Sequence, residues 1–389
     1  MPLTEYFVDL HIHIGRTMYD RPVKITASKT LTLTNILKEA SNYKGLDMVG
    51  IIDAHVPAVQ EELVRLIHSG KAYELEGGGI RFQDTTLILG SEIELYDENC
   101  RGPVHVLCYF PDLDRLKSFA EWLKERMKNI HLSSQRFYGT ARELQHKVKE
   151  LDGLFIPAHV FTPFKSLYGK GVVKSLKEIF HPDLIDGIEL GLSSDSHMAD
   201  HISELRTYTF VTNSDAHSLK KMAREYQVME MTAPTFDELR KVLHQSDGRS
   251  VRANYGMNPK LGKYYTTVCE KCLTTIDDQK VCPKCSHSRS IKGVFDRIQE
   301  LKDREPALNS RPPYIYQAPL EYIPGLGPKT YENLLKNAGT EMYILHQATR
   351  DELQTASSEK IADHILAMRS GQMNIAAGGG GKYGKLKTD

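Results

Sequence analysis

Residues 7–15 read Phe-Val-Asp9-Leu-His11-Ile-His13-Ile-Gly15, and this stretch indicates both a β-strand and a functional site. Side chains two residues apart on a strand point to the same face, so Asp9, His11 and His13 can converge on one point. The apolar residues between them would pack against the opposite face. A single strand histidine is more often a hydrogen-bonded core residue than a metal ligand. A metal site is therefore indicated only if other strands contribute further histidines or carboxylates.

The first 250 residues repeat this strand pattern. Short apolar runs predict seven strands, at 7–12, 48–52, 86–95, 104–110, 154–160, 185–190 and 207–212. Between them lie helix-like segments such as 57–69 and 140–151, whose apolar residues recur at spacings of three and four. This alternation is typical of an α/β protein with parallel strands and crossover helices, in a barrel or an open sheet.

Polar residues gather at the ends of these strands. Six of the seven strands run into His, Asp or Glu at or near the carboxyl end, and the other contains a histidine: Asp9, His11 and His13; Asp53 and His55; Glu92 and Glu94; His105; His159; Glu189; Asp215 and His217. Burying so many of these groups without partners would cost a large free energy. The carboxyl ends of barrel strands open onto one face. Imidazoles mixed with carboxylates suit Zn²⁺, Mn²⁺ or Fe²⁺ better than Mg²⁺, so we expect a multinuclear metal site.

In order along the chain, DLHIHIG, IIDAH, the Glu92 strand, PAHVF and NSDAH resemble the motifs of the PHP (polymerase and histidinol phosphatase) superfamily. The resemblance covers about residues 1–252. It implies a distorted (β/α)7 barrel that binds up to three metals and hydrolyses phosphoesters. By this resemblance, a first metal is held by His11, His13, Glu92 and Asp215, a second by Glu92, His105 and His159 with Glu92 bridging, and His55 and His217 hold a third or complete the other two.

Three other carboxylates of the strand ends are assigned catalytic roles: Asp9, Asp53 and Glu189. Asp53 is either a ligand or a partner that orients His55. Tyr19 stands where many PHP enzymes carry a further histidine. We therefore expect two tightly bound divalent metals (Zn²⁺, Mn²⁺, Fe²⁺ or Mg²⁺), with the third position open.

Four of the six cysteines form two pairs, Cys269-x2-Cys272 and Cys282-x2-Cys285, separated by nine residues. Four thiolates at this spacing predict a closed, structural Zn²⁺ site in a ribbon-like module. The alternative, two redox-active pairs, has no thioredoxin-like context. Paired cysteines of this kind, the absence of a leader-like N-terminus and the absence of an apolar run near 18 residues favour a cytoplasmic, nucleoid-associated protein without a membrane partner.

The C-terminal part is basic although the whole chain is neutral, with 50 basic and 50 acidic residues. From Val251 onward, 20 Lys and Arg accompany 15 Asp and Glu, which suits a phosphate-bearing partner or a solvated surface. Here Gly325-Leu-Gly327-Pro-Lys329 resembles the turn of a helix-hairpin-helix motif. Such a turn presents backbone N–H groups that can receive a phosphate and read no sequence. We expect three parts: 1–255 catalytic, 256–293 zinc module, and 294–389 helical with a Gly-rich tail.

Together the three parts resemble the endonuclease Q family, through PAHVFTPFKSLYG, GLSSDSHMAD, NSDAHS and GGGGKYGK. The resemblance implies a DNA repair endonuclease that nicks 5′ to deaminated bases (uracil, hypoxanthine or xanthine) and abasic sites. Two positions depart from it, Phe164 in place of Trp and His201 in place of Arg. The alternatives are a PHP-type phosphatase acting on a small phosphomonoester, and a non-catalytic nucleic-acid-binding scaffold, which would need a degraded metal site.

The loop after His159 is the predicted site of lesion recognition. Chemistry selective for an altered base in a duplex favours extrusion of that base into a pocket. The loop offers aromatic rings for stacking and cations for phosphate, and the residues predicted to bind DNA are Phe164, Lys165, Tyr168 and Lys170, together with Gly325, Gly327 and Lys329. In the alternative interpretation, Phe161 and Phe164 only pack the loop onto the barrel.

Overall fold

The computed structural model describes residues 2–262, 264–276, 281–306 and 311–370, together with the backbone of 374–376 and 385–387. Most of the predicted Gly-rich tail, 377–384, lies outside the described residues. The short strands β16 (Asn374–Ala376) and β17 (Lys385–Lys387) on either side of it pair antiparallel. No helix within the described ranges is both long and apolar enough to cross a membrane.

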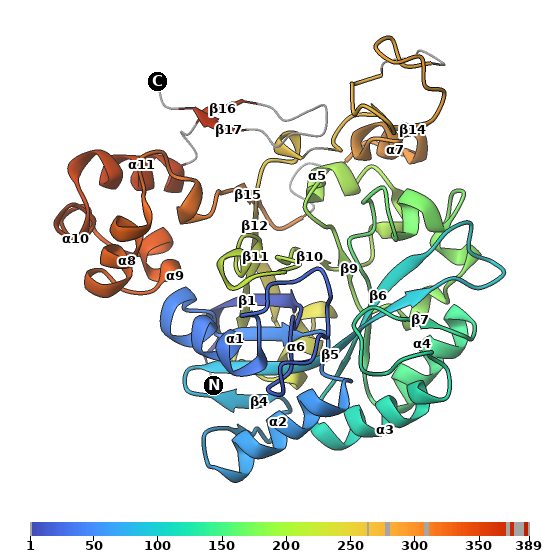
Figure 1. Cartoon of the computed structure of the whole chain (residues 1–389), viewed down its shortest axis with the longest axis horizontal. Coiled ribbons are helices and arrows are strands. Elements are labelled where there is room, and N and C mark those ends of the chain that lie inside the picture. Colours follow the sequence, from blue (N-terminus) through green and yellow to red (C-terminus); the bar gives the residue numbers. More distant parts are fainter. Residues whose placement is uncertain are drawn as a thin grey trace.

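Within the described residues, eleven strands form one mixed sheet with helices outside it (Figure 1). The strands are β1 (Thr4–Ile12), β2 (Met48–Ile51), β3 (Tyr73–Glu74), β4 (Ile80–Phe82), β5 (Thr85–Leu95), β6 (Val104–Phe110), β7 (Arg136–Phe137), β8 (Leu154–Pro157), β11 (Tyr226–Met231), β12 (Ser250–Gly256) and β15 (Tyr314–Tyr316). The hydrogen-bonded order is β15-β12-β11-β1-β2-β5-β4-β3, and β6 joins β5 to β8. The predicted α/β class is thus confirmed.

A small parallel pair, β9 (Ile188–Glu189) and β10 (Phe210–Val211), lies between β8 and β1. Val160 N donates to the carbonyl of Glu189 at 3.0 Å, and His13 N donates to that of Ala216 at 3.1 Å. These two bonds link the small sheet to both of its neighbours. The ends of the seven predicted strands therefore surround one region.

The prediction that the strands are parallel is wrong for part of the sheet. β2 pairs parallel with β1 and β5, but β6 pairs antiparallel with both β5 and β8, and β11 pairs antiparallel with β1. A parallel connection needs a crossover of about a dozen residues or more, and residues 96–103 between β5 and β6 are too few. The chain therefore returns directly beside β5.

The helices of the first 250 residues begin where their sequences provide caps. The helices are α1 (Leu33–Glu39), α2 (Pro57–His68), α3 (Leu113–Lys124), α4 (Ala141–Glu150), α5 (Ser196–Ala199) and α6 (Phe236–Leu243). Thr32, Asp112, Thr140 and Thr235 accept hydrogen bonds from first-turn backbone N–H groups, and Pro57 opens α2. Shorter π or 3₁₀ segments are η1 (Ala40–Lys44), η2 (Leu167–Gly171), η3 (Leu176–Glu178), η4 (Pro182–Leu184), η5 (Ser203–Leu205), η6 (Leu219–Lys221), η7 (Pro259–Leu261) and η8 (Leu320–Tyr322).

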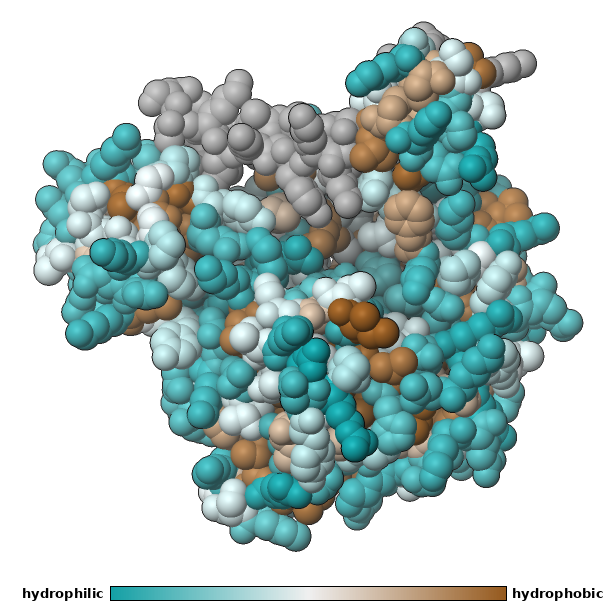
Figure 2. Space-filling view, in the orientation of Figure 1, coloured by the Kyte–Doolittle hydropathy of each residue, from teal (hydrophilic) through white to brown (hydrophobic). Residues whose placement is uncertain are grey.

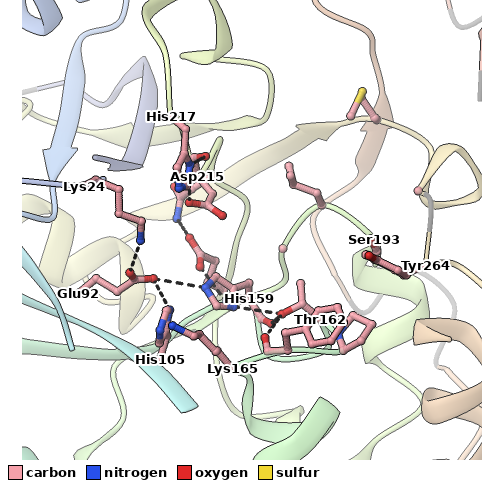
Figure 3. Close-up of a pocket in the computed structure, with 18 of the residues that line it drawn as sticks. Lys24, Glu92, His105, His159, Thr162, Lys165, Ser193, Asp215, His217 and Tyr264 are labelled. Carbon is pink, nitrogen blue, oxygen red and sulfur yellow. Dashed lines mark hydrogen bonds and ion pairs between the residues drawn. The ribbon is translucent and has the colours of Figure 1, made fainter. Parts of the chain in front are cut away.

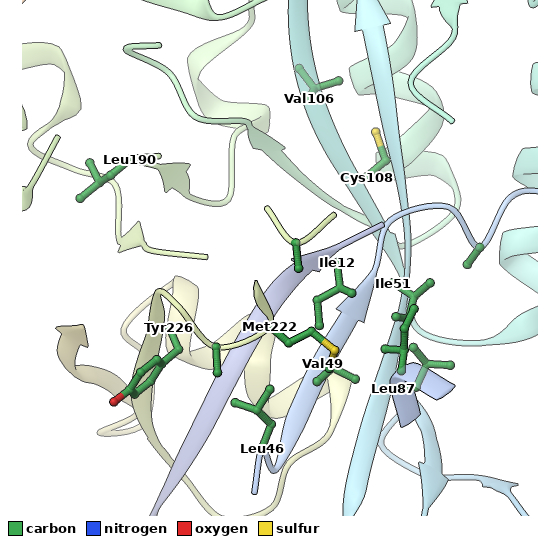
Figure 4. Close-up of a cluster of buried hydrophobic side chains, with 14 of the residues drawn as sticks. Ile12, Leu46, Val49, Ile51, Leu87, Val106, Cys108, Leu190, Met222 and Tyr226 are labelled. Atoms are coloured by element: carbon green, nitrogen blue, oxygen red, sulfur yellow. The ribbon is translucent and has the colours of Figure 1, made fainter. Parts of the chain in front are cut away.

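Both faces of the central strands are buried, in two hydrophobic clusters. Along β5, Leu87 and Leu89 belong to the cluster that includes residues of α1 to α4, and Ile88 belongs to the cluster that includes residues of α6. Figure 4 shows the first cluster, with Val49 and Ile51 of β2 beside Leu87. Burial on both faces explains why these strands are nearly continuous apolar runs in the sequence. The exterior over α2, α3 and α4 is largely hydrophilic (Figure 2).

The rest of the chain forms two smaller units beside this body (Figure 1). One contains β13 (Val268–Cys269), β14 (Ser290–Ile291) and α7 (Val294–Leu301), and the other contains α8 (Pro328–Asn337), α9 (Glu341–His346), α10 (Arg350–Ala356) and α11 (Glu359–Arg369). β15 extends the large sheet by pairing parallel with β12. Lys44 and Glu341, which are 2% and 1% exposed, form a buried ion pair that attaches α9 to η1.

Candidate metal centre and pocket

Two of the polar residues at the strand ends have a left-handed backbone. His159 follows β8 with a φ of 31°, and Asp215 follows β10 with a φ of 45°. Such conformations cost roughly 1–3 kcal/mol for residues other than glycine and cluster at functional sites. Gly191 makes room for His159, because a Cβ at position 191 would lie 2.7 Å from the Cβ of His159. The backbone thus holds both side chains in defined positions.

Three overlapping groups of possible metal ligands lie at these strand ends, and within each group all ligand atoms are within 4.8 Å of one another. The groups are His11, His13 and Glu92; His13, Asp215 and His217; and Glu92, His105 and His159. Asp215 Oδ1 lies 3.5 Å from His11 Nε2 and 3.4 Å from His13 Nε2. Because Glu92 belongs to two groups, it is placed where a carboxylate could bridge two metals.

The donor atoms fit divalent metals. The Nε2 atoms of His11, His13 and His105 are buried and, among the described residues, have no hydrogen-bond partner. Unpaired buried nitrogens are costly unless an ion contacts them. Ligands about 2.1 Å from a tetrahedral metal lie about 3.4 Å apart. The Nε2 atoms of His11 and His13 lie 3.4–3.6 Å from carboxylate oxygens of Glu92 and Asp215, which is close to that separation.

The electrostatics of this centre also favour cations. Burial alone would raise the pKa of Glu92, but nearby positive charge, led by that of His105, holds it well below its usual value. The pKa of Asp215 is likewise well below its usual value, because the charge of His11 leads the effects that outweigh burial. Burial lowers the pKa of His11, yet the carboxylates of Glu189 and Asp215 raise it to about 10. The carboxylates therefore remain ionised. Their negative charge favours a cation at the centre, either a proton on a histidine ring or a metal ion.

Asp53 and Glu189 lie behind the ligands and orient them. Asp53 Oδ2 is 3.1 Å from His13 Nδ1, and Glu189 Oε1 is 2.9 Å from His11 Nδ1. Each contact turns the other ring nitrogen toward the centre. The turn after β2 brings Asp53 beside the end of β1, so its hydrogen-bonded histidine is His13, whereas the sequence favoured His55. We propose supporting rather than directly catalytic roles for both carboxylates.

Asp9 does not reach the ligand groups. It is completely buried, and its carboxylate accepts hydrogen bonds at 3.0 Å from the backbone N–H groups of Ser214 and Ala223. Burial raises the pKa of this carboxyl group. The position corrects the predicted catalytic role: Asp9 braces the loop that carries Asp215.

His55 and Tyr19 also lie outside the three groups. His55 is completely buried, and in the part of the chain that the structure describes neither ring nitrogen has a hydrogen-bond partner of normal geometry. The structure places His217 with His13 and Asp215, and not with His55. Tyr19 is 47% exposed, so it does not replace the missing histidine ligand.

A cavity of about 330 Å³ lies over the ligand groups, within the roughly 300–1,000 Å³ range of small-ligand sites. Lys24 and Tyr264 line it on opposite sides of the ligands (Figure 3). Lys24 Nζ is 3.4 Å from Glu92 Oε2 and therefore adds a cation at the metal centre. Lys24 was not predicted because it lies in an irregular loop, and its one signal in the sequence is a basic residue that follows the His-x-His pair.

The loop after β8 forms one wall of the cavity. Phe164 is 47% exposed, lines the cavity and packs edge-on against Tyr264, with 5.6 Å between the ring centroids. Lys165 also lines it and pairs with Glu94 at 2.8 Å, and Lys170 is exposed. Phe164 and Lys165 are thus positioned to contact a ligand in the cavity, whereas Lys170 does not line it.

Tyr168 differs from its prediction as a DNA-binding residue. The side chain is completely buried, stacks on Phe161 at 5.3 Å, and donates a hydrogen bond to Glu204 at 2.7 Å. It holds the loop against the body of the protein and has no free ring face for a base. Phe161 therefore packs the loop, as the alternative interpretation predicted, whereas Phe164 is exposed at the cavity and stays a predicted DNA contact.

The four predicted zinc-ligating cysteines form one cluster. The Sγ atoms of Cys269 and Cys285 are 3.6 Å apart. The Sγ atom of Cys272 lies 3.4 Å from the Sγ atoms of both Cys282 and Cys285. These separations are too long for a disulfide and close to the roughly 3.8 Å expected for four thiolates around Zn²⁺. The antiparallel pair β13–β14 carries the first of these cysteines.

Cys282→Ser should remove the zinc of this cluster and weaken DNA binding severalfold, while the catalytic body stays folded, because a closed thiolate site couples metal binding to local folding. Zinc content per chain, circular dichroism and DNA binding measure these effects. Cys100→Ser removes a thiol outside the cluster and should leave the zinc content unchanged. An undiminished zinc content in the Cys282→Ser protein would contradict the assignment.

The predicted phosphate-binding turn is open to solvent. Gly325 has a φ of 85°, and a Cβ at either Gly325 or Gly327 would meet no atom within 4 Å. The turn leads directly into α8, which begins at Pro328, and Lys329 is exposed in its first turn. A phosphate could therefore approach the first backbone N–H groups of this helix.

An α/β fold with overlapping histidine and carboxylate groups at its strand ends has the arrangement of a metal-dependent enzyme. No family model matches the chain. The chain is similar to the lesion-specific endonuclease PfuEndoQ from Pyrococcus furiosus, with a TM-score of 0.84 and 34% identity, covering 99% of this chain and 95% of that one. It is equally similar to an endonuclease Q in complex with a 27-mer duplex that carries an abasic lesion at the active site (TM-score 0.83, 33% identity, 99% and 97% covered). The chain belongs to the endonuclease Q family.

Two uncharacterised proteins are also similar. YqxK of Bacillus subtilis (strain 168) is 52% identical over 386 residues, which are 99% of this chain and all of that protein. MJ0043 of Methanocaldococcus jannaschii is 37% identical over 254 residues, which are 58% of this chain and 31% of that protein. The similarity to YqxK thus extends over essentially the whole chain.

Proposed function

We propose that this protein is a DNA repair endonuclease that uses divalent metals to nick the phosphodiester 5′ to deaminated bases and abasic sites. The observation that carries the proposal is the position of an aromatic-walled cavity directly over three groups of metal-ligating residues. A related endonuclease Q places an abasic lesion at its active site. A phosphodiester over the ligands would leave the adjoining nucleotide beside Phe164 and Tyr264.

Divalent metals held by the three ligand groups would supply an activated water and neutralise charge on the reacting phosphate. The protein's own contribution is positioning. Glu189 and Asp53 fix the rings of His11 and His13, and the ammonium group of Lys24 adds positive charge beside Glu92. Such preorganised charge stabilises a transition state more than the same groups would in water.

The cavity wall is suited to an extruded base. Phe164 offers an exposed ring face, and its edge-on contact with Tyr264 fixes its orientation. Stacking accepts any base, so discrimination between uracil, hypoxanthine and xanthine must come from polar groups around the ring edge. Ser193 and Asn258 line the same cavity and are the groups we assign to that task.

We also propose that the three parts of the chain divide the work at the boundaries predicted from the sequence, 1–255, 256–293 and 294–389. The first part holds the ligands and would be the distorted (β/α)7 barrel. The open turn at Gly325 and Gly327, with Lys329, would hold a phosphate away from the lesion. The zinc module and this turn favour a DNA substrate over a small phosphomonoester, which needs neither.

The decisive experiment is metal-supplemented cleavage of end-labelled duplexes that contain uracil, hypoxanthine or an abasic site. We expect one nick on the 5′ side of each lesion, no cleavage of the same duplex without a lesion, and no product in the presence of a chelator. Turnover of a simple phosphomonoester with no nicking of any lesion would favour the phosphatase instead.

DNA binding should weaken steeply as the salt concentration rises, because lysines and arginines that neutralise phosphates release counterions. A titration of fluorescent duplex between low and physiological salt measures the slope. Lys329→Ala should reduce the slope of log affinity against log salt concentration by the share of about one phosphate contact. Lys38→Ala, at the end of α1, removes one surface charge elsewhere and serves as the control. A salt-independent affinity would contradict a phosphate-dominated interface.

A further inference from the structure

The loop that carries Phe164 is tied by one arginine to α7, the helix that directly follows the zinc module. Arg297 lies on α7, and its guanidinium group donates to the carbonyls of Tyr168, Val172 and Val173 at 2.8, 3.3 and 2.7 Å. The side chain is only 18% exposed. The planar fork of an arginine can hold several carbonyls at once, which a lysine cannot do in the same way.

A second contact joins the same two elements on the cavity side. Tyr264 packs edge-on against Phe164, and the carbonyl of Tyr264 accepts a hydrogen bond from Val294 N at 2.9 Å, at the start of α7. The wall of the cavity is therefore held from α7 at two points. One point lies behind the loop and the other lies at its exposed ring.

α7 is in turn connected to the cysteine cluster. Asp296 accepts hydrogen bonds from the backbone and the hydroxyl of Thr267, and Gly293 N donates to the Thr267 hydroxyl at 3.0 Å. Thr267 directly precedes β13, which ends at Cys269 of the cluster. A continuous set of contacts thus runs from the zinc ligands through α7 to the loop.

The loop itself transmits this support to Phe164. Ser166 donates from its hydroxyl to the carbonyl of Thr162 and accepts from Gly169 N at 3.1 Å, so residues 162–171 form one hydrogen-bonded unit. Fixing the carbonyls at 168, 172 and 173 therefore also limits the movement of the ring at 164.

From these contacts we infer that the zinc module positions the base-holding wall of the catalytic cavity, and that Arg297 is the positioning residue through which it sets lesion selectivity. The inference rests on the proposed function. A module that only bound DNA would affect all lesions equally. A module that positions the wall matters most where a base must be held, and an abasic site has no base.

Arg297→Ala should slow nicking at uracil about tenfold and nicking at an abasic site less than about twofold, since a displaced stacking platform loses part of its contribution. Arg297→Lys keeps the charge but not the fork, and should lose most of the same selectivity. Lys292→Ala is the matched control: Lys292 pairs with Glu300, as Arg297 also does, but has no contact with the loop among those recorded for the described residues. It should leave both rates unchanged.

Hydrogen–deuterium exchange without DNA gives a readout that does not depend on cleavage. The amides of Tyr168, Gly171 and Val172 donate within the loop and should exchange faster in Arg297→Ala than in Lys292→Ala, at unchanged zinc content. Unchanged exchange, or equal rate losses on both lesions, would overturn the positioning role. Wild-type protein that nicks neither lesion would instead overturn the proposed function, while the exchange data still decide whether Arg297 restrains the loop.

Discussion

Replacing His11 or Asp215 by alanine should abolish nicking of lesion-containing DNA while leaving DNA binding largely intact. Asp215 Oδ1 lies within 3.5 Å of ring nitrogens of His11, His13 and His217, so its loss disturbs several ligands at once. Metal ions contribute several kcal/mol of transition-state stabilisation, which corresponds to a rate loss of at least about 10³-fold. The proposed DNA contacts of Phe164 and of the turn at Gly325 remain in both variants.

The measurement is single-turnover cleavage of an abasic duplex, together with binding of the same duplex in the absence of added metal. His68→Ala is a suitable control because His68 is an exposed histidine at the end of α2, on the outside of the protein. Metal analysis should show fewer bound ions in the two variants, with the zinc of the four-cysteine cluster retained. A variant that nicks at the wild-type rate would show that the ligand assignment is wrong.

Much of the centre could be predicted from the sequence because its residues have short-range signatures. His11 and His13 share a strand face by their spacing alone, and Asp215 and His217 repeat that spacing at the end of another strand. Buried apolar runs marked seven strands within a few residues of their observed bounds, but β11 and β12, which lie beside β1 in the large sheet, were not predicted. The cysteine spacing likewise predicted a cluster that the structure shows.

The features that were missed depend on contacts distant in sequence. Asp53 contacts His13 across 40 residues, and Lys24 contacts Glu92 across 68, and neither pairing has a local pattern. The direction of β6 follows from the length of a connection rather than from the composition of the strand. Tyr168 has the composition of a stacking residue, but its burial is decided by the pairing with Glu204.

The structure also separates the three carboxylates that were predicted to be catalytic, which their residue type alone could not do. Asp9, Asp53 and Glu189 look identical to ligands in the sequence, since all three lie at or near strand ends, and Asp9 and Asp53 also lie two residues from a histidine. The structure separates them by what they face: backbone N–H groups for Asp9, and ring nitrogens for the other two. An aligned Nδ1 leaves Nε2 for the metal, so the supporting carboxylates are as necessary to the geometry as the ligands are.

Phe164→Ala should reduce nicking at uracil about 5- to 150-fold, because stacking contributes roughly 1–3 kcal/mol per base, and should change nicking at an abasic site less than about twofold. The ring is 47% exposed over the cavity, so its removal takes away a base platform without opening the hydrophobic core. Phe164→Trp, which restores the larger ring expected from the family resemblance, should retain uracil nicking.

Tyr168→Phe provides the matched control in the same loop. It keeps the ring that stacks on Phe161 and removes the hydrogen bond to Glu204, so any loss should be equal for the two lesions. Rates for uracil and abasic duplexes of one sequence, measured with enzyme in excess, give the ratio that isolates base holding from cleavage chemistry. If Phe164→Ala lowers both rates equally, or neither, then Phe164 packs the loop and the extruded base is held elsewhere in the cavity.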